Sequence, residues 1–123
     1  MVLVDTSVWI RFLANRAPYA RELDRLLALD EVAGHELVFG ELLIGDRGGR
    51  QTLLDAYRRM HRAKTVLHQE VIGFVRNRKL QGRGLGWIDV HLLASALIDQ
   101  FHLWTADLSL QAAAVDLGVS YRY

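Results

Sequence analysis

Two aspartates in this 123-residue chain follow stretches of sequence that are typical of buried strands. Asp5 ends the apolar run 2–4, and Asp107 comes just after the stretch 102–105. In a parallel sheet, ligands bind beyond the carboxyl ends of the strands, so we expect both carboxylates at one edge of a sheet. The alternative for each is a purely structural role as the N-cap of the helix that follows it.

Two further acids lie within apolar helical stretches. Glu41 shares a helix stripe with Val38 and Leu42, so its side chain should face the interior, where a lone carboxylate is costly. Asp89 occupies the first turn of the apolar stretch 87–99, where the helix dipole favours an ionised acid. A surface aspartate that only stabilises this dipole is the alternative for Asp89.

Four carboxylates that converge on one sheet edge would repel one another unless a divalent cation neutralised them. The chain has no cysteine, and its five histidines are scattered, with no pair four residues apart. Oxygen donors without such partners select Mg²⁺ or Mn²⁺ over Zn²⁺, so we expect a site for one or two of these ions. The segments GDRGG and GRGLG match neither a Walker motif nor a dinucleotide-binding motif, so no nucleotide cofactor is expected.

Basic residues are concentrated between positions 58 and 83, where eight of them accompany a single acid, Glu70, for a net charge of +7. The rest of the chain has seven basic and thirteen acidic residues, a net charge of −6. An acidic centre beside a basic surface suits a polyanionic substrate, and a solvated helix face is the alternative. The candidates for phosphate contacts are Arg58, Arg59, Arg62, Arg76, Arg78, Lys79 and Arg83.

The hydrophobic pattern predicts the elements that position these side chains. Strands are expected at 2–4 and 102–105, with further candidates at 65–67 and 119–121, and a short stretch at 31–33 separates two helices. Helices are expected at 6–13, 18–29, 34–44, 50–61, 68–80, 87–99 and 107–117. The alternation of short buried strands with longer helices predicts an α/β fold in one domain over 1–123, with a central parallel sheet flanked by helices on both faces.

Composition sets the remaining bounds. A chain with 51% hydrophobic and 24% charged residues fits one globular domain. The longest stretch without Asp, Glu, Lys or Arg is the nine residues 90–98, about half of what a membrane span needs. The N-terminus lacks the basic start and small-residue cleavage site of a secretory signal, so we expect a cytoplasmic protein without a membrane span.

Four motifs occur in order along almost the whole chain: VDTSVWI, FGELLIG, WIDVHLLASAL and LWTADLSL. Together they resemble the PIN-domain ribonucleases and, more narrowly, the VapC-type toxins of bacterial toxin–antitoxin systems. The resemblance implies that the catalytic residues, which also hold Mg²⁺ or Mn²⁺, are Asp5, Glu41, Asp89 and Asp107. Thr6 and Thr105 match hydroxyl residues that support this quartet in the family.

The sequence departs from the family pattern at two places. Ser109 and Leu110 stand where members often have an aromatic residue or a further acid, so the metal-binding set is minimal. Phe39 stands where many members have Thr or Ser, so Glu41 lacks polar support from that position. Neither departure removes one of the four acids.

The resemblance implies that the protein is an endoribonuclease and the toxin of a type II toxin–antitoxin pair. It would cleave cellular RNA by metal-activated water. Such cleavage leaves 5′-phosphate and 3′-hydroxyl ends. The resemblance also implies a homodimer and a cognate antitoxin. Two other classes stay open: a catalytically inactive PIN-like module that binds RNA or protein, and a phosphorelay receiver-like domain. The receiver would need a lysine after a later strand, and the only lysines are Lys64 and Lys79.

The first predicted helix is more apolar than one buried face requires. Its residues Trp9, Ile10, Phe12 and Leu13, together with the helix at 18–29, could form a groove for an amphipathic helix of the antitoxin. The alternative is that these side chains belong to the core. The sequence does not identify the RNA target.

Overall fold

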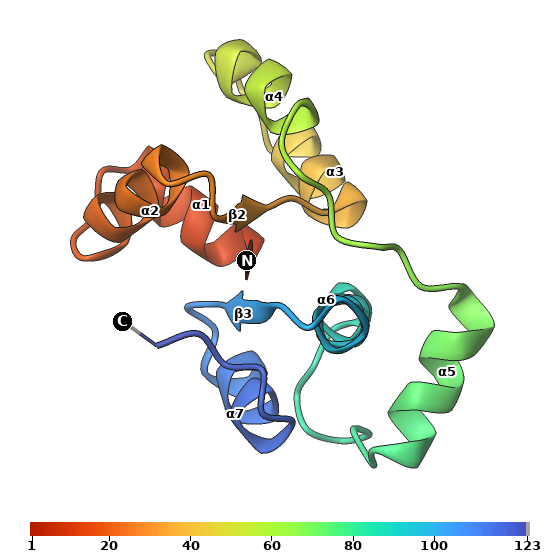
Figure 1. The fold of residues 1–123 in the computed structure, drawn as a ribbon. Coiled ribbons are helices and arrows are strands. Elements are labelled where there is room, and N and C mark those ends of the chain that lie inside the picture. The colour runs from red at the N-terminus through yellow and green to blue at the C-terminus, as the bar shows by residue number, and fades with distance from the viewer. Residues whose placement is uncertain (123) are drawn as a thin grey trace.

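A three-stranded parallel sheet lies at the centre of the computed structural model, which describes residues 1–122 (Figure 1). Its strands are β1 (Val2–Val4), β2 (Val32–Ala33) and β3 (His102–Trp104), in the order β2-β1-β3. Leu3 pairs with Ala33 on one side and with Leu103 on the other. The strand that comes first in the chain is therefore the central strand.

Seven helices connect and cover the strands within the described part of the chain. They are α1 (Thr6–Leu13), α2 (Tyr19–Ala28), α3 (Glu36–Ile44), α4 (Gln51–Arg58), α5 (His68–Asn77), α6 (Trp87–Asp99) and α7 (Leu108–Asp116). Helices occupy both crossovers between the strands, as parallel pairing requires. None of the helices described has the length and apolar character that a bilayer crossing would need.

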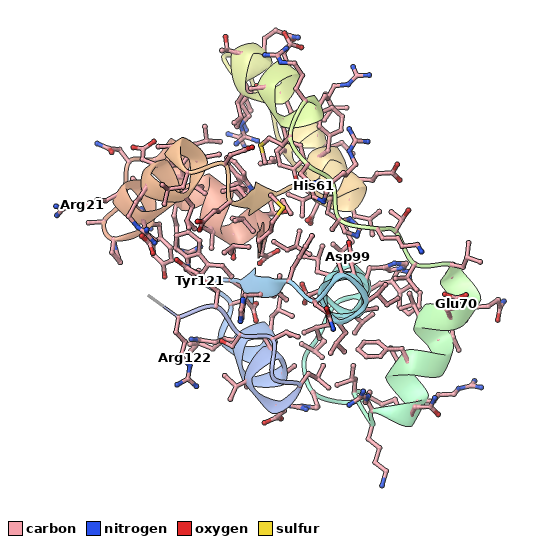
Figure 2. The ribbon with its side chains drawn as sticks, viewed as in Figure 1. Arg21, His61, Glu70, Asp99, Tyr121 and Arg122 are labelled. Atoms are coloured by element: carbon pink, nitrogen blue, oxygen red, sulfur yellow. The ribbon has the colours of Figure 1, made fainter. Side chains whose placement is uncertain are left out.

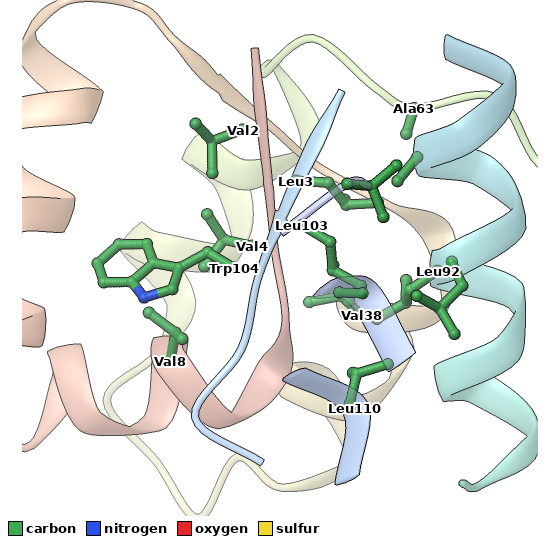
Figure 3. Packing of buried hydrophobic residues seen from close by; sticks show 14 of the residues in the cluster. Val2, Leu3, Val4, Val8, Val38, Ala63, Leu92, Leu103, Trp104 and Leu110 are labelled. Carbon is green, nitrogen blue, oxygen red and sulfur yellow. The ribbon is translucent and has the colours of Figure 1, made fainter. Parts of the chain in front are cut away.

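The two faces of the sheet pack against different helices. Val4 and Trp104 point toward the side of α1, whereas Leu3 and Leu103 point toward Leu92 of α6 (Figure 3). All five side chains are buried. Strands buried on both faces are continuously apolar rather than alternating, which explains the apolar sequence of β1 and the adjacent Leu103 and Trp104 in β3. The predicted α/β fold, a parallel sheet with helices on both faces, is confirmed.

The predicted helices are all present, but two predicted strands are wrong. Residues 65–67 lie in an irregular connection with no strand pairing. Residues 119–121 contribute only a single bridge, between Leu103 and Ser120. The stretch 31–33 supplies β2, whose two residues are too few to show a pattern of their own.

The third helix begins later than predicted, at Glu36 instead of Gly34. Gly34 is held in extended geometry, because its N–H donates to the carbonyl of His61 and its carbonyl accepts from the N–H of Ala63, both at 2.7 Å. A Cβ on Gly34 would lie 2.9 Å from Cε1 of Tyr57. Glycine therefore serves close packing here and does not open a helix.

The apolar residues of α1 divide between the core and the surface. Trp9 has no exposed surface, and its indole packs edge-on against Phe12 and Tyr57 at centroid distances of 5.7 and 5.5 Å. Ile10 and Leu13 are 47% and 40% exposed. The core interpretation is therefore correct for Trp9, and a groove for a partner helix cannot use its side chain.

Candidate active site

Asp5 lies at the carboxyl end of the central strand, where β1 passes into α1. Its backbone N–H donates to the carbonyl of Trp104 at 2.9 Å, which fixes it beside the end of β3. The carboxylate is buried and makes no capping hydrogen bond to α1, so the N-cap alternative is wrong for its side chain. Instead, the hydroxyls of Ser7 and Thr105 donate to its Oδ2 at 2.7 and 2.8 Å.

Ser7 is a site residue that the sequence analysis missed. Besides donating to Asp5, its Oγ accepts from the N–H of Ala106 at 3.0 Å and lies 3.3 Å from Oγ1 of Thr105. Ser7 thereby joins the first turn of α1 to the loop between β3 and α7. The available signal was a second hydroxyl residue, two positions after the acid, in the same motif as Thr6.

Asp107 lies in the loop after β3, two residues beyond Thr105, whose hydroxyl donates to Asp5. Its N–H donates to Oγ1 of Thr105 at 3.0 Å, so Thr105 contacts both acidic residues. Its Oδ1 accepts from the N–H of Leu110 at 2.9 Å and caps α7. The structural alternative considered for Asp107 is thus observed, while its exposed carboxylate keeps Oδ2 available to solvent or a cation.

Glu41 lies on α3 and is half-buried, less enclosed than its helix stripe predicted. The hydroxyl of Thr6 donates to its Oε1 at 2.6 Å and links α1 to α3. This hydrogen bond supplies from α1 the polar support that Phe39 cannot give. Phe39 instead packs against Tyr57, with ring centroids 6.0 Å apart.

The pKa of Asp89 is raised in part by the charges of the other three predicted acids. Its Oδ2 accepts from the N–H of Gly86 at 2.8 Å in the first turn of α6. Burial is the largest cause that raises the pKa of Asp89, the Gly86 hydrogen bond opposes this shift, and the charges of three other carboxylates raise the pKa further. Those three are Asp5, Asp107 and Glu41. The structure therefore places the other three predicted acids within electrostatic reach of Asp89.

The four carboxylates share a hydrogen-bonding pattern that suits cation binding. In each, hydrogen bonds from the described residues reach one oxygen and leave the other free; the bonded atoms are Oδ2 of Asp5, Oε1 of Glu41, Oδ2 of Asp89 and Oδ1 of Asp107. Free carboxylate oxygens are the donors that Mg²⁺ and Mn²⁺ prefer. Across residues 1–122, no three acidic or histidine side chains are grouped closely enough to form a ready-made metal site. The donors fit such an ion, but the side chains would have to draw together around it.

The basic residues between 58 and 83 form two separate groups rather than one surface. Arg58, Arg59 and Arg62 lie at the end of α4, and we call Arg76, Arg78, Lys79 and Arg83, at and beyond the end of α5, the α5-end cluster. The two helices lie on different sides of the molecule (Figure 1). The connection between them passes the end of α6, where the Lys64 N–H donates to Asp99 at 2.7 Å (Figure 2).

We expect the substitution Asp89→Asn to stabilise the protein in the presence of a chelator at pH 7. The raised pKa of Asp89 means that the folded state loses its proton at a higher pH than the unfolded state, whose pKa is near 3.8. The fold is therefore penalised once pH rises past this window, and it is not penalised below it. Melting curves should show a higher Tm for Asp89→Asn at pH 7, with a gap to wild type that closes as pH falls toward 3.8.

The exposed Asp24 of α2 offers the matched control. Asp24→Asn should leave Tm nearly unchanged at both pH values, because surface substitutions away from special features usually have small effects. A lower Tm for Asp89→Asn than for wild type at pH 7 would contradict the electrostatic description of the four acids.

Comparisons with known proteins agree with this architecture. The sequence matches the PIN domain family over residues 2–116. It is 46% identical over 121 residues to Ribonuclease VapC32 of two Mycobacterium tuberculosis strains, H37Rv and CDC 1551, covering 98% of this chain and 95% of each relative. The fold is similar to the crystal structure of PAE2754 from Pyrobaculum aerophilum, with a TM-score of 0.58, 19% identity and coverage of 95% and 94% of the two chains.

Proposed function

Because the chain belongs to the PIN-domain family, we propose that it is an endoribonuclease of the VapC kind, the toxin of a toxin–antitoxin pair, and that it depends on Mg²⁺ or Mn²⁺. The observation that carries this proposal is the placement of Asp5, Glu41 and Asp107 within electrostatic reach of Asp89 at the carboxyl edge of a parallel sheet. This edge is where such folds bind ligands. The near-full-length likeness to a protein named as a ribonuclease supports RNA as the substrate.

The chain's own residues would prepare this edge for cleavage. Asp5, Glu41, Asp89 and Asp107 would hold the cation, which when bound supplies neutralisation of the scissile phosphate and a lowered pKa for water. Ser7 and Thr105 orient Asp5, and Thr6 orients Glu41, so that their free oxygens have restricted directions. Burial and the neighbouring carboxylates raise the pKa of Asp89, and an approaching cation would lower it.

An antitoxin would regulate the enzyme by covering this edge. An apolar hollow beside Glu41 is lined by Leu37, Gly40, Ile44 and Ile88, and Ile44 is 91% exposed. Such a surface suits the apolar face of a partner segment, whose arginine could pair with the carboxylates in place of a cation. The homodimer is proposed on the family resemblance alone. A toxin of this kind would act in the cytoplasm, where its RNA substrates are.

A second candidate function is a catalytically inactive PIN module that binds RNA or protein. The observation that favours it is the lack of a ready-made metal site within residues 1–122. A phosphorelay receiver has no such support, because Lys64 lies in the connection before α5 and Lys79 follows α5, so neither follows a strand.

The ends of the RNA products test the proposed function. With purified protein and Mg²⁺ or Mn²⁺, we expect cleavage of RNA to 5′-phosphate and 3′-hydroxyl ends, because water and not the ribose 2′-hydroxyl would attack the phosphate. Mass spectrometry of the RNA fragments distinguishes attack by water from attack by the ribose 2′-hydroxyl. Fragments with 2′,3′-cyclic phosphate would contradict the mechanism, and intact RNA together with no heat on metal titration would favour the inactive module.

A further inference from the structure

Trp87 differs from the other two tryptophans of the chain. Trp9 and Trp104 are 0% and 3% exposed, whereas Trp87 is 44% exposed. It begins α6, two residues before Asp89, so an exposed indole lies in the same helical turn as one of the four acids. An exposed indole at this place offers an aromatic face to a ligand.

Two histidine rings pack against this indole. The ring of His68 lies 5.1 Å from the Trp87 ring in a tilted arrangement, and the ring of His91 lies 5.0 Å away and nearly perpendicular. His91 is buried, and its Nδ1 has no hydrogen-bond partner among the residues described. The two imidazoles restrict the orientation of the indole, so the surface that it presents to solvent is defined in advance.

A hollow of about 130 Å³ adjoins Trp87. Its walls combine apolar side chains from the end of α5, the following loop and α6, and its lining includes Val75, Leu80, Leu85 and Val90. Three cations of the α5-end cluster, Arg76, Arg78 and Lys79, are exposed and lie between Val75 and Leu80 in the sequence. The fourth, Arg83, is half-buried and pairs with Asp116 at 2.7 Å. The hollow thus has an aromatic wall, and exposed cations directly follow or precede two of its lining residues in the sequence, Val75 and Leu80.

We propose that Trp87 and this hollow form a subsite that stacks one base of single-stranded RNA near the cleavage site, while Arg76, Arg78 and Lys79 of the α5-end cluster contact neighbouring phosphates. The inference rests on the proposed function and adds a substrate contact to it. Proteins bind unpaired RNA by stacking its bases on aromatic rings, and this contact tolerates any base because every base has a π face. Phosphate contacts from arginine and lysine supply affinity without sequence information.

The first measurement uses the wild-type chain with a chelator present, so that RNA is bound and not cut. A single-stranded oligoribonucleotide should quench the emission of the exposed Trp87, and the same sequence as a duplex should quench it far less. Trp87→Phe should abolish this signal, because Trp9 and Trp104 are buried. Equal quenching by strand and duplex, or no quenching at RNA concentrations that saturate binding, would overturn the proposal.

The second measurement compares variants. Loss of one base stack corresponds to a Kd for the single strand that is about 10-fold to 100-fold weaker in Trp87→Ala. Trp87→Phe should restore most of the affinity. Ile98→Ala is the matched control, because Ile98 is a 53% exposed apolar residue at the other end of α6, and its Kd should equal that of wild type. A wild-type Kd in Trp87→Ala, or equal loss in Trp87→Phe and Trp87→Ala, would overturn the proposal.

Cleavage assays separate failure of this inference from failure of the proposed function. If wild type cleaves RNA with Mg²⁺ or Mn²⁺, Trp87→Ala should raise KM about as much as Kd and change kcat little. An unchanged KM in Trp87→Ala would reject the proposed base-stacking subsite but would not affect the proposed ribonuclease function. Absence of cleavage by wild type would reject the proposed enzyme, and base stacking by Trp87 would then have to be judged from the binding data alone.

Discussion

Asp5→Asn is expected to lower the rate of RNA cleavage by about three orders of magnitude or more, because it removes one of the charges that would hold the cation. The loss should be largest at this position, since Asp5 is the buried member at the end of the central strand. Asparagine keeps a side-chain oxygen that can accept from Ser7 and Thr105. The fold should therefore survive the substitution, and the effect on cleavage should be chemical.

The measurement is single-turnover cleavage of a defined RNA, with Mn²⁺ titration by calorimetry on the same samples. Wild type should release or absorb heat on binding the ion, and Asp5→Asn should show little. Asp24→Asn, which changes the same residue type on the exposed side of α2, should cleave at the wild-type rate. Cleavage by Asp5→Asn within tenfold of wild type would remove Asp5 from the proposed cation site.

Trp9→Ala is expected to lower the free energy of unfolding by about 3–5 kcal/mol, the usual cost of truncating a large buried aromatic residue. Trp9 is fully buried between Phe12 and Tyr57, so the substitution leaves a cavity in the packing of α1. Chemical denaturation followed by circular dichroism measures this loss. Leu13→Ala on the same helix, 40% exposed, should cost far less.

Trp9→Phe distinguishes the effect of lost side-chain volume from the effect of the buried indole N–H at the same position. The indole Nε1 is buried without a hydrogen-bond partner among the described residues, and an unpaired buried donor costs about 1–3 kcal/mol. Phenylalanine removes that donor while it keeps most of the ring, so Trp9→Phe should lie much nearer to wild type than Trp9→Ala. Unchanged stability of Trp9→Ala together with lost affinity for an antitoxin would instead restore the groove interpretation.

The sequence signals that selected the four acids are local, and the structure places three of these acids within electrostatic reach of the fourth, Asp89. An apolar run followed directly by Asp5 indicates both a buried strand and the end of that strand. The same reasoning applies to Asp107. Helix periodicity selected Glu41, although its side chain is only half-buried, and the first turn of an apolar helix selected Asp89. The hydroxyl pair that donates to Asp5 was harder to predict, because Ser7 and Thr105 are 98 residues apart and meet only when β1 and β3 pair.

The basic segment shows why a charge count along the sequence is insufficient. Eight basic residues within positions 58–83 suggested one surface, but the irregular connection between α4 and α5 carries the two halves apart (Figure 1). A count of charges within a sequence segment does not reveal this separation in space. The short strand β2 was equally difficult, since two residues carry no periodicity.

The central position of β1 has a consequence for the biosynthesis of the protein. Thr105, which donates to the carboxylate of Asp5, lies 100 residues later in the chain and is therefore synthesised well after Asp5. One side of the central strand stays open until β3 has been translated, and Asp107 follows β3. Domains generally fold as units during synthesis, and a contact between such distant residues forms late. A nascent chain is therefore unable to assemble the acidic edge before β3 and Asp107 have been synthesised, and under the proposed function it would not cleave RNA until then.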